Sequence, residues 1–106
     1  MARINEDNYN YRITFSRETD TPLWKPVSHL QASLHWSNRS FYTVKQTEKN
    51  ELTLYGDWDN QEIDMVNFST YYPGILFLVE RWKTETPGNI TSFSYKDGKV
   101  ISDNKS

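Results

Sequence analysis

The 106-residue chain contains no cysteine, only four glycines and no long apolar run. Without cysteine there is no disulfide, no thiolate ligand for zinc and no thiol nucleophile. Four scattered glycines do not form a glycine-rich loop of the kind that holds phosphate groups. The longest apolar stretch, residues 75–79, is too short for a helix that crosses a membrane. We therefore expect neither a cofactor nor membrane insertion.

Basic residues are also missing from one long interval. No Lys or Arg occurs between Lys49 and Arg81, although the net charge of the whole chain is only −2. The remaining basic residues are dispersed and form no run, which disfavours direct nucleic-acid binding. An acidic middle instead favours a protein partner with a basic surface, because complementary charge speeds association. The carboxylates of this interval are Glu51, Asp57, Asp59, Glu62, Asp64 and Glu80.

Aromatic residues make up 15% of the chain and replace the sparse aliphatic residues as core material. One buried aromatic side chain removes about 150–250 Å² from water, so a few can support a core. The length fits a single domain over residues 1–106, and we expect residues 1–8 and 103–106 to be loose ends. No signal-like apolar segment is visible near Met1, so the expected location is the cytoplasm.

Residues 57–83 are the most readable part of the chain. Asp59 and Glu62 have the spacing of a helix capping box, and Trp58 and Ile63 stand at the positions of a hydrophobic staple. Pro73 disfavours helix at the residue before it, so the helix should end near residue 71 or 72. Its apolar stripe would comprise Met65, Phe68 and Tyr72, broadened by Ile63 and Val66.

The unbroken apolar run at residues 75–79 predicts a strand that is covered on both faces. A helix that leads directly into such a strand is expected to pack on its sheet. Alternation over residues 9–15 predicts a half-buried first strand. Two hairpins are also predicted, one from residues 41–44 and 52–55, and one from residues 90–95 and 99–102 around Asp97-Gly98.

Residues 26–36 allow two interpretations. Pro26 suits the first turn of a helix, and Val27, Leu30 and Leu34 have helical spacing. A strand is the alternative, because the apolar residues also alternate at Leu30, Ala32, Leu34 and Trp36. Leu, Gln and Ala favour the helix, but the pattern alone does not decide.

With a helix there, the element order is β-α-β-β-α-β followed by a hairpin. This order predicts an α+β protein with a ferredoxin-like split β-α-β antiparallel sheet, both helices on one face, and an appended C-terminal hairpin. The other face of the sheet would be partly open. An open face rich in Tyr and Trp is a candidate binding surface.

A resemblance covers residues 58–100. The segments that carry it are Trp58, Asp64-Met65, Phe68-Ser69, Tyr72-Pro73, Ile75-Leu76-Phe77 and Lys96-Asp97-Gly98-Lys99. Together they resemble a group of small ferredoxin-like domains in bacterial, prophage and phage proteins of mostly unknown role. Residues 80–84 depart from the group, which often has a Gly- and Glu-rich stretch there. The resemblance implies a ferredoxin-like fold and a mobile-element origin.

No arrangement of side chains in the sequence points to catalysis or to a metal. His29 and His35 are expected to be surface or hydrogen-bonded residues, and no Gly-x-Ser-x-Gly motif occurs. Asp57, Asp59, Glu62 and Asp64 lack the glycine turn and final glutamate of a calcium loop. We interpret these four mainly as helix-terminal carboxylates, with an acidic recognition patch as the alternative and a metal site as a weaker one.

The function expected from these features is a non-enzymatic protein-binding module. The narrower expectation is a phage or mobile-element inhibitor of a host defence protein such as a CRISPR nuclease, located in the host cytoplasm. Alternatives are an immunity protein that neutralises a toxin, and a small-ligand or carbohydrate-binding domain that uses exposed Trp and Tyr. For Trp82 a place in the core is the preferred interpretation, and a contact role is the alternative. The candidate protein-binding residues are Asp57, Asp59, Glu62, Asp64, Glu80 and Trp82.

Overall fold

A computed structural model describes residues 8–17, 20, 22–37 and 41–105. Most of the loose N-terminal end predicted at residues 1–8 therefore lies outside the described residues. The described elements are β1 (Tyr9–Arg17), α1 (Trp24–Ser37), β2 (Phe41–Glu48), β3 (Glu51–Gly56), α2 (Gln61–Ser69), β4 (Ile75–Lys83), β5 (Thr86–Lys96) and β6 (Lys99–Lys105).

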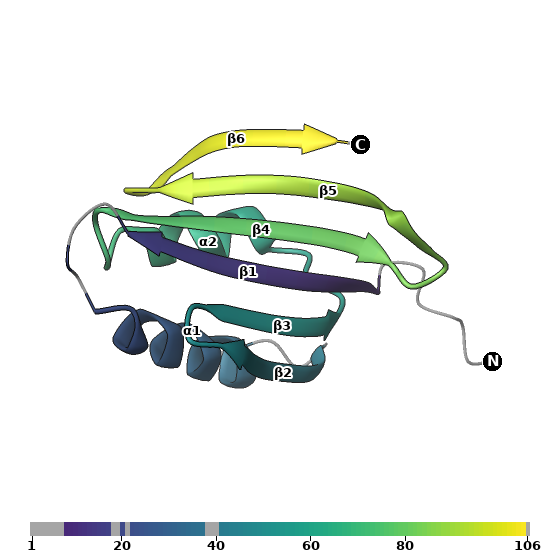
Figure 1. The fold of residues 1–106 in the computed structure, drawn as a ribbon, viewed down its shortest axis with the longest axis horizontal. Coiled ribbons are helices and arrows are strands. Elements are labelled where there is room, and N and C mark those ends of the chain that lie inside the picture. Colours follow the sequence, from purple (N-terminus) through teal and green to yellow (C-terminus); the bar gives the residue numbers. More distant parts are fainter. Residues whose placement is uncertain (1–7, 18–19, 21, 38–40, 106) are drawn as a thin grey trace.

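The strands form one antiparallel sheet in the order β2-β3-β1-β4-β5-β6, and both helices lie behind it (Figure 1). The α+β class and the helices on one face are therefore confirmed. The ferredoxin-like topology is not confirmed, because the order of the six strands is not that of a four-stranded ferredoxin-like sheet. The predicted C-terminal hairpin is present, and it lengthens the sheet beyond β4.

The alternation predicted for β1 is confirmed and decides which face of the sheet is buried. Tyr11, Ile13 and Phe15 are at most 1% exposed. Leu52 and Val79 lie directly opposite Ile13 on the two neighbouring strands and share its face. The core therefore lies between this face and the two helices.

Burial along β4 corrects the prediction of a strand covered on both sides. Ile75, Phe77 and Val79 are fully buried under the helices, whereas Leu76 and Leu78 are only half-buried. Both helices occupy the same face, so no helix that the structure describes covers the opposite side of β4. An unbroken apolar run does not distinguish these two cases.

The helix predicted over residues 26–36 is confirmed as α1. Val27, Leu30 and Leu34 are at most 2% exposed and form its buried stripe, as the helical spacing predicts. Pro26 is buried in the first turn, where the missing N–H leaves no helical bond unmade. Within the described residues, neither helix has the length and apolar content needed to span a membrane.

Helix α2 departs from its predicted start. Its N-cap residue is Asn60, with no side-chain capping bond, so the capping box of Asp59 and Glu62 is wrong. Ile63 is 61% exposed, so the staple with Trp58 is wrong as well. Trp58 instead turns into the core, where its ring centroid lies 5.4 Å from that of Tyr11. Burial of this large ring determines the path of the chain into α2.

The helix also ends earlier than predicted, at Ser69. Thr70 closes the last turn because its hydroxyl donates to the carbonyl of Asn67 at 2.6 Å. Residues 70–74 then form turns before β4. At the C-terminus, residues 103–105 belong to β6, so the loose end predicted over residues 103–106 is wrong for the part that the structure describes.

The turn between β5 and β6 is tied to the end of α2. Asp97 and Gly98 have positive φ values of 52° and 79°, as a two-residue hairpin turn requires. The N–H of Gly98 donates to the hydroxyl of Ser69 at 2.8 Å, and the N–H of Gly74 donates to the carboxylate of Asp97 at 3.0 Å. These bonds fasten the hairpin to the helix layer.

Replacing Gly98 by Ala is expected to lower the free energy of unfolding by about 1–3 kcal/mol. The φ value of +79° disfavours a side chain, and a Cβ would lie 2.8 Å from the Thr70 methyl group. Gly88→Ala is the matched control, since nothing lies within 4 Å of its Cβ. Urea denaturation measures the free energy of unfolding of both variants. An equal decrease in the two would show that a side chain at position 98 does not strain the turn.

Tyr11 gives a pH-dependent prediction. Burial raises the pKa of its hydroxyl to about 12. The pKa is higher in the folded than in the unfolded protein, so the neutral hydroxyl of Tyr11 stabilises the fold. This contribution is complete below pH 10 and is lost as pH rises through 12. The free energy of unfolding should fall by up to about 2–3 kcal/mol more in the wild type than in Tyr11→Phe over this range. The free energy of unfolding is measured against pH for both proteins. An equal fall in the wild type and in Tyr11→Phe would contradict the prediction.

Candidate functional site

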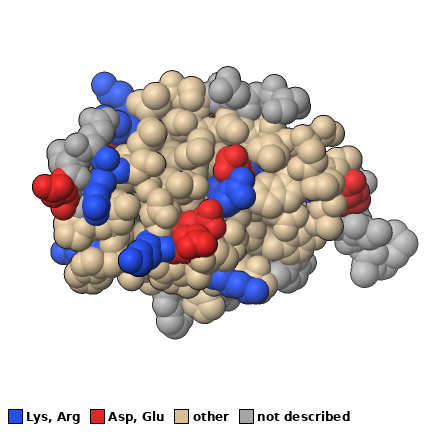
Figure 2. Space-filling model, in the orientation of Figure 1, with Lys and Arg blue, Asp and Glu red and all other residues tan. Residues whose placement is uncertain are grey.

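The sheet face opposite the helices is not covered by any helix that the structure describes. We call it the open face. Strands β1 and β4 pass in front of α2 in Figure 1, so Figure 2 views this face directly; it is mostly uncharged, with a few charged side chains near its middle. The register assigns to it Asn10, Arg12, Thr14, Ser16, Thr43, Lys45, Glu51, Thr53, Tyr55, Leu76, Leu78, Glu80, Trp82, Ser92 and Ser94.

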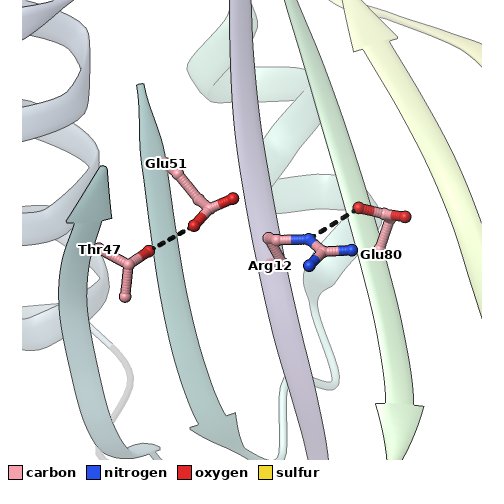
Figure 3. A network of polar contacts seen from close by, with 4 residues as sticks. All are labelled: Arg12, Thr47, Glu51 and Glu80. Atoms are coloured by element: carbon pink, nitrogen blue, oxygen red, sulfur yellow. Dashed lines mark hydrogen bonds and ion pairs between the residues drawn. The ribbon is translucent and has the colours of Figure 1, made fainter. Parts of the chain in front are cut away.

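An ion pair lies at the centre of the open face. Arg12 of β1 and Glu80 of β4 are directly opposite in the register, and Nε of Arg12 donates to the Glu80 carboxylate at 3.0 Å (Figure 3). The hydrogen bond to Glu80 raises the pKa of Arg12. An exposed pair of this kind contributes only about 0–1 kcal/mol to stability. Its main effect is to neutralise Glu80, one of the predicted contact residues.

Trp82 follows Glu80 on the same face. Its side chain is half-buried, and the guanidinium carbon of Arg12 lies 5.6 Å from its ring centroid. Trp82 therefore stands outside the buried core, and the core interpretation of this residue is wrong. Together with Tyr55 and Thr43 it lines a shallow cavity of about 130 Å³. Two predicted contact residues, Glu80 and Trp82, are thus neighbours on the open face.

The other four candidate residues lie on the helix side, around the start of α2. Asp57 is half-buried in the connection from β3, Asp59 is exposed in the following turn, and Glu62 and Asp64 are in the first turn of α2. The structure therefore does not bring the six candidates into one patch. Carboxylates at this position are favoured by the helix dipole, each by about 0.3–1 kcal/mol.

These four carboxylates differ in their contacts. Asp64 accepts a hydrogen bond from the indole Nε1–H of Trp58 at 2.8 Å. Asp57 also has an interaction, and its charge contributes to the raised pKa of Tyr11. Asp59 and Glu62 are exposed and make no hydrogen bond or ion pair with any residue that the structure describes. Only these two fit the predicted description of free recognition carboxylates.

Arg81 is a functional candidate that sequence reasoning missed. It lies between Glu80 and Trp82 but points to the helix-covered face, since neighbouring strand residues alternate. Its guanidinium carbon lies 4.8 Å from the ring centroid of Tyr9 and 5.0 Å from that of Phe93. Extending the alternation of Ile75, Phe77 and Val79 by one more step would have indicated this orientation.

His29 of α1 packs among aromatic side chains of α2 and the turns that follow it. Nδ1 of His29 lies 2.8 Å from the Tyr72 hydroxyl, and its ring packs against Phe68, as a hydrogen-bonded histidine would. In the portion of the chain that the structure describes, no three His, Asp or Glu side chains gather closely enough to hold a metal ion.

The different contacts of Asp64 and Glu62 lead to a stability prediction. Asp64→Ala removes a charge-assisted hydrogen bond and should lower the free energy of unfolding by about 1–2 kcal/mol. Glu62→Ala, in the same helical turn, should change it by less than about 0.5 kcal/mol. Chemical denaturation followed by tryptophan fluorescence measures both values. If Glu62→Ala were the more damaging substitution, the structural role assigned to Asp64 would be wrong.

Comparisons with protein-family models, with curated proteins and with solved structures find no match to this chain. The resemblance of residues 58–100 to small ferredoxin-like phage and bacterial domains therefore stays a prediction from the sequence pattern.

Proposed function

We propose that the chain is a protein-binding module and that the open face is its main contact surface. The observation that supports this most is that half-buried apolar side chains lie around a central ion pair. Leu76, Leu78 and Trp82 lie on a face that no helix covers, and the central Glu80 is paired with Arg12. Centres of protein interfaces are likewise depleted of charge and enriched in aromatic residues.

Polar groups surround this apolar centre. Thr53 lies beside it on β3, and Ser92 and Ser94 lie opposite Glu80 and Leu78 on β5. Hydroxyl groups at these positions can form hydrogen bonds with a partner, and such bonds offset the cost of removing the hydroxyls from water. An apolar centre with a polar surround is the usual anatomy of a protein interface.

Asp59 and Glu62 supply the acidic part of the proposal. Both are exposed and lie in the interval without Lys or Arg. Their charges would speed association with a basic partner even if they lie at the edge of the interface, because steering acts over roughly the Debye length of about 10 Å. In this proposal the open face provides most of the binding affinity, and the two carboxylates raise the association rate.

The partner class is a narrower proposal. An inhibitor of a host defence protein, such as a CRISPR nuclease, would occupy a basic channel, and the acidic interval supports that choice together with the resemblance of residues 58–100. An immunity protein would use the same kind of surface. A carbohydrate site on the open face has less support, because Arg12 lies over the Trp82 ring and the adjacent cavity measures about 130 Å³.

For the fold, we propose that strands β2-β3-β1-β4 form a split β-α-β unit of the ferredoxin-like kind to which β5 and β6 were added. The support is that β1 lies between β3 and β4, while α1 and α2 both cover the same face. An experimental structure of a relative that ends after β4 would test this.

The open face can be tested with aromatic variants matched by type. Tyr55→Ala with Trp82→Ala alters the open face, and Tyr71→Ala with Trp24→Ala alters aromatic side chains that are 69% and 68% exposed outside the core. Binding partners are identified by affinity capture from host extract and then measured with purified protein. The open-face pair should weaken binding by about tenfold or more, and the control pair by less than about twofold.

A third variant, Asp59→Asn with Glu62→Gln, should lower the association rate and its salt dependence while leaving the dissociation rate nearly unchanged. Circular dichroism and denaturation verify that each variant folds. Equal binding by the wild type and the open-face variant would refute the proposed contact surface, whatever the acidic variant does.

A further inference from the structure

A second site lies on the helix side, away from the open face. A cavity of about 290 Å³ opens between the start of α2 and strands β4 and β5. Trp58 and Phe93 supply aromatic walls, Gln61 and Arg81 supply polar groups, and the exposed carboxylates of Asp59 and Glu62 complete the lining. Two of the residues in this lining each contain a buried polar atom that has no hydrogen-bond partner among the described residues.

The first of these atoms belongs to Gln61, which is only 5% exposed. Its Nε2 donates to the hydroxyl of Tyr95 at 2.8 Å, whereas its Oε1 is buried and accepts nothing from the described residues. Exchanging the two amide atoms would leave the nitrogen without a partner instead. One buried amide group therefore stays unsatisfied in either orientation, which is uncommon in folded proteins.

The second atom is Nε of Arg81. It is buried and has no acceptor among the described residues. The guanidinium group is held between the rings of Tyr9 and Phe93, at 4.8 Å and 5.0 Å from their centroids. The aromatic contacts fix the orientation of this donor without satisfying it. Two residues of the cavity lining thus hold an unused acceptor and an unused cationic donor, both of them buried.

The charges of the lining restrict which ligand fits. A simple cation would be repelled by Arg81, and a simple anion would be repelled by Asp59 and Glu62. An apolar ligand would leave both buried atoms unpaired and would gain no free energy from them. A ligand that carries one positive and one negative group satisfies all of these conditions.

We propose that this cavity binds a small zwitterion of the α-amino acid type. Its carboxylate accepts from Nε of Arg81, its ammonium group donates to Oε1 of Gln61 and faces Asp59 and Glu62, and an apolar side chain packs against Trp58 and Phe93. Both buried atoms are closed to solvent, so binding includes a small side-chain movement. This site lies apart from the open face, although Asp59 and Glu62 belong both to its lining and to the carboxylates proposed to speed association with a protein partner.

Nuclear magnetic resonance of the ¹⁵N-labelled full chain tests the site. L-leucine is the probe, with L-leucinamide lacking the carboxylate and N-acetyl-L-leucine lacking the ammonium group. L-leucine at millimolar concentration should shift the signals of the Arg81 Nε–H, the Gln61 amide and the Trp58 indole. Each analogue should bind about tenfold more weakly or worse, since each loses a charge-assisted bond.

Two substitutions and their controls complete the test. Gln61→Leu and Arg81→Met should each weaken L-leucine binding by about tenfold or more. Gln46→Leu and Arg17→Met, which are exposed and lie away from this cavity, should leave it unchanged. If a cavity variant does not fold, the comparison of L-leucine with its two analogues on the wild type still decides. Unshifted Arg81 and Gln61 signals, or equal binding of the analogues, would overturn the proposal and leave a cavity that holds only water.

Discussion

The central position of β1 is the constraint on which the rest of the structure depends. It pairs with β3 on one side and β4 on the other, so its two-residue alternation sets the inner and outer faces of both neighbours. Tyr11, Ile13 and Phe15 point to the helices, and a slip of one residue would move all three to the open face. The same alternation places Arg12 opposite Glu80. Core and open face are therefore products of one register.

The sequence predicted the elements whose signals are local. The alternation of β1, the helical spacing of Val27, Leu30 and Leu34, and the Asp97-Gly98 turn each act over a few residues, and the structure confirms them. The start of α2 could not be predicted in this way. Asp59 and Glu62 have the spacing of a cap, but burial of the Trp58 ring against Tyr11 moved the start to Gln61. A tertiary contact outweighed a capping bond worth about 1 kcal/mol.

The candidate site was predictable in part for the same reason. Glu80 and Trp82 share the open face because strand periodicity places them there, and Leu76 and Leu78 continue the same row. The position of these open-face residues relative to Asp59 and Glu62 depends on how α2 packs on the sheet. No local sequence pattern specifies that packing. Arg81 was overlooked because its significance comes from Tyr9 and Phe93 on two other strands.

In the interval without Lys or Arg, several of the carboxylates have partners in the structure. Glu80 is neutralised by Arg12 from outside the interval, and Asp64 holds the indole of Trp58. Of the four carboxylates around the start of α2, this leaves Asp59 and Glu62 exposed and without contacts among the described residues, at the cavity that also contains Arg81. A Lys or Arg nearby would pair with these two carboxylates and remove the charge separation between them and Arg81. The absence of Lys and Arg from this interval therefore fits the proposal that these two carboxylates contact a ligand or partner.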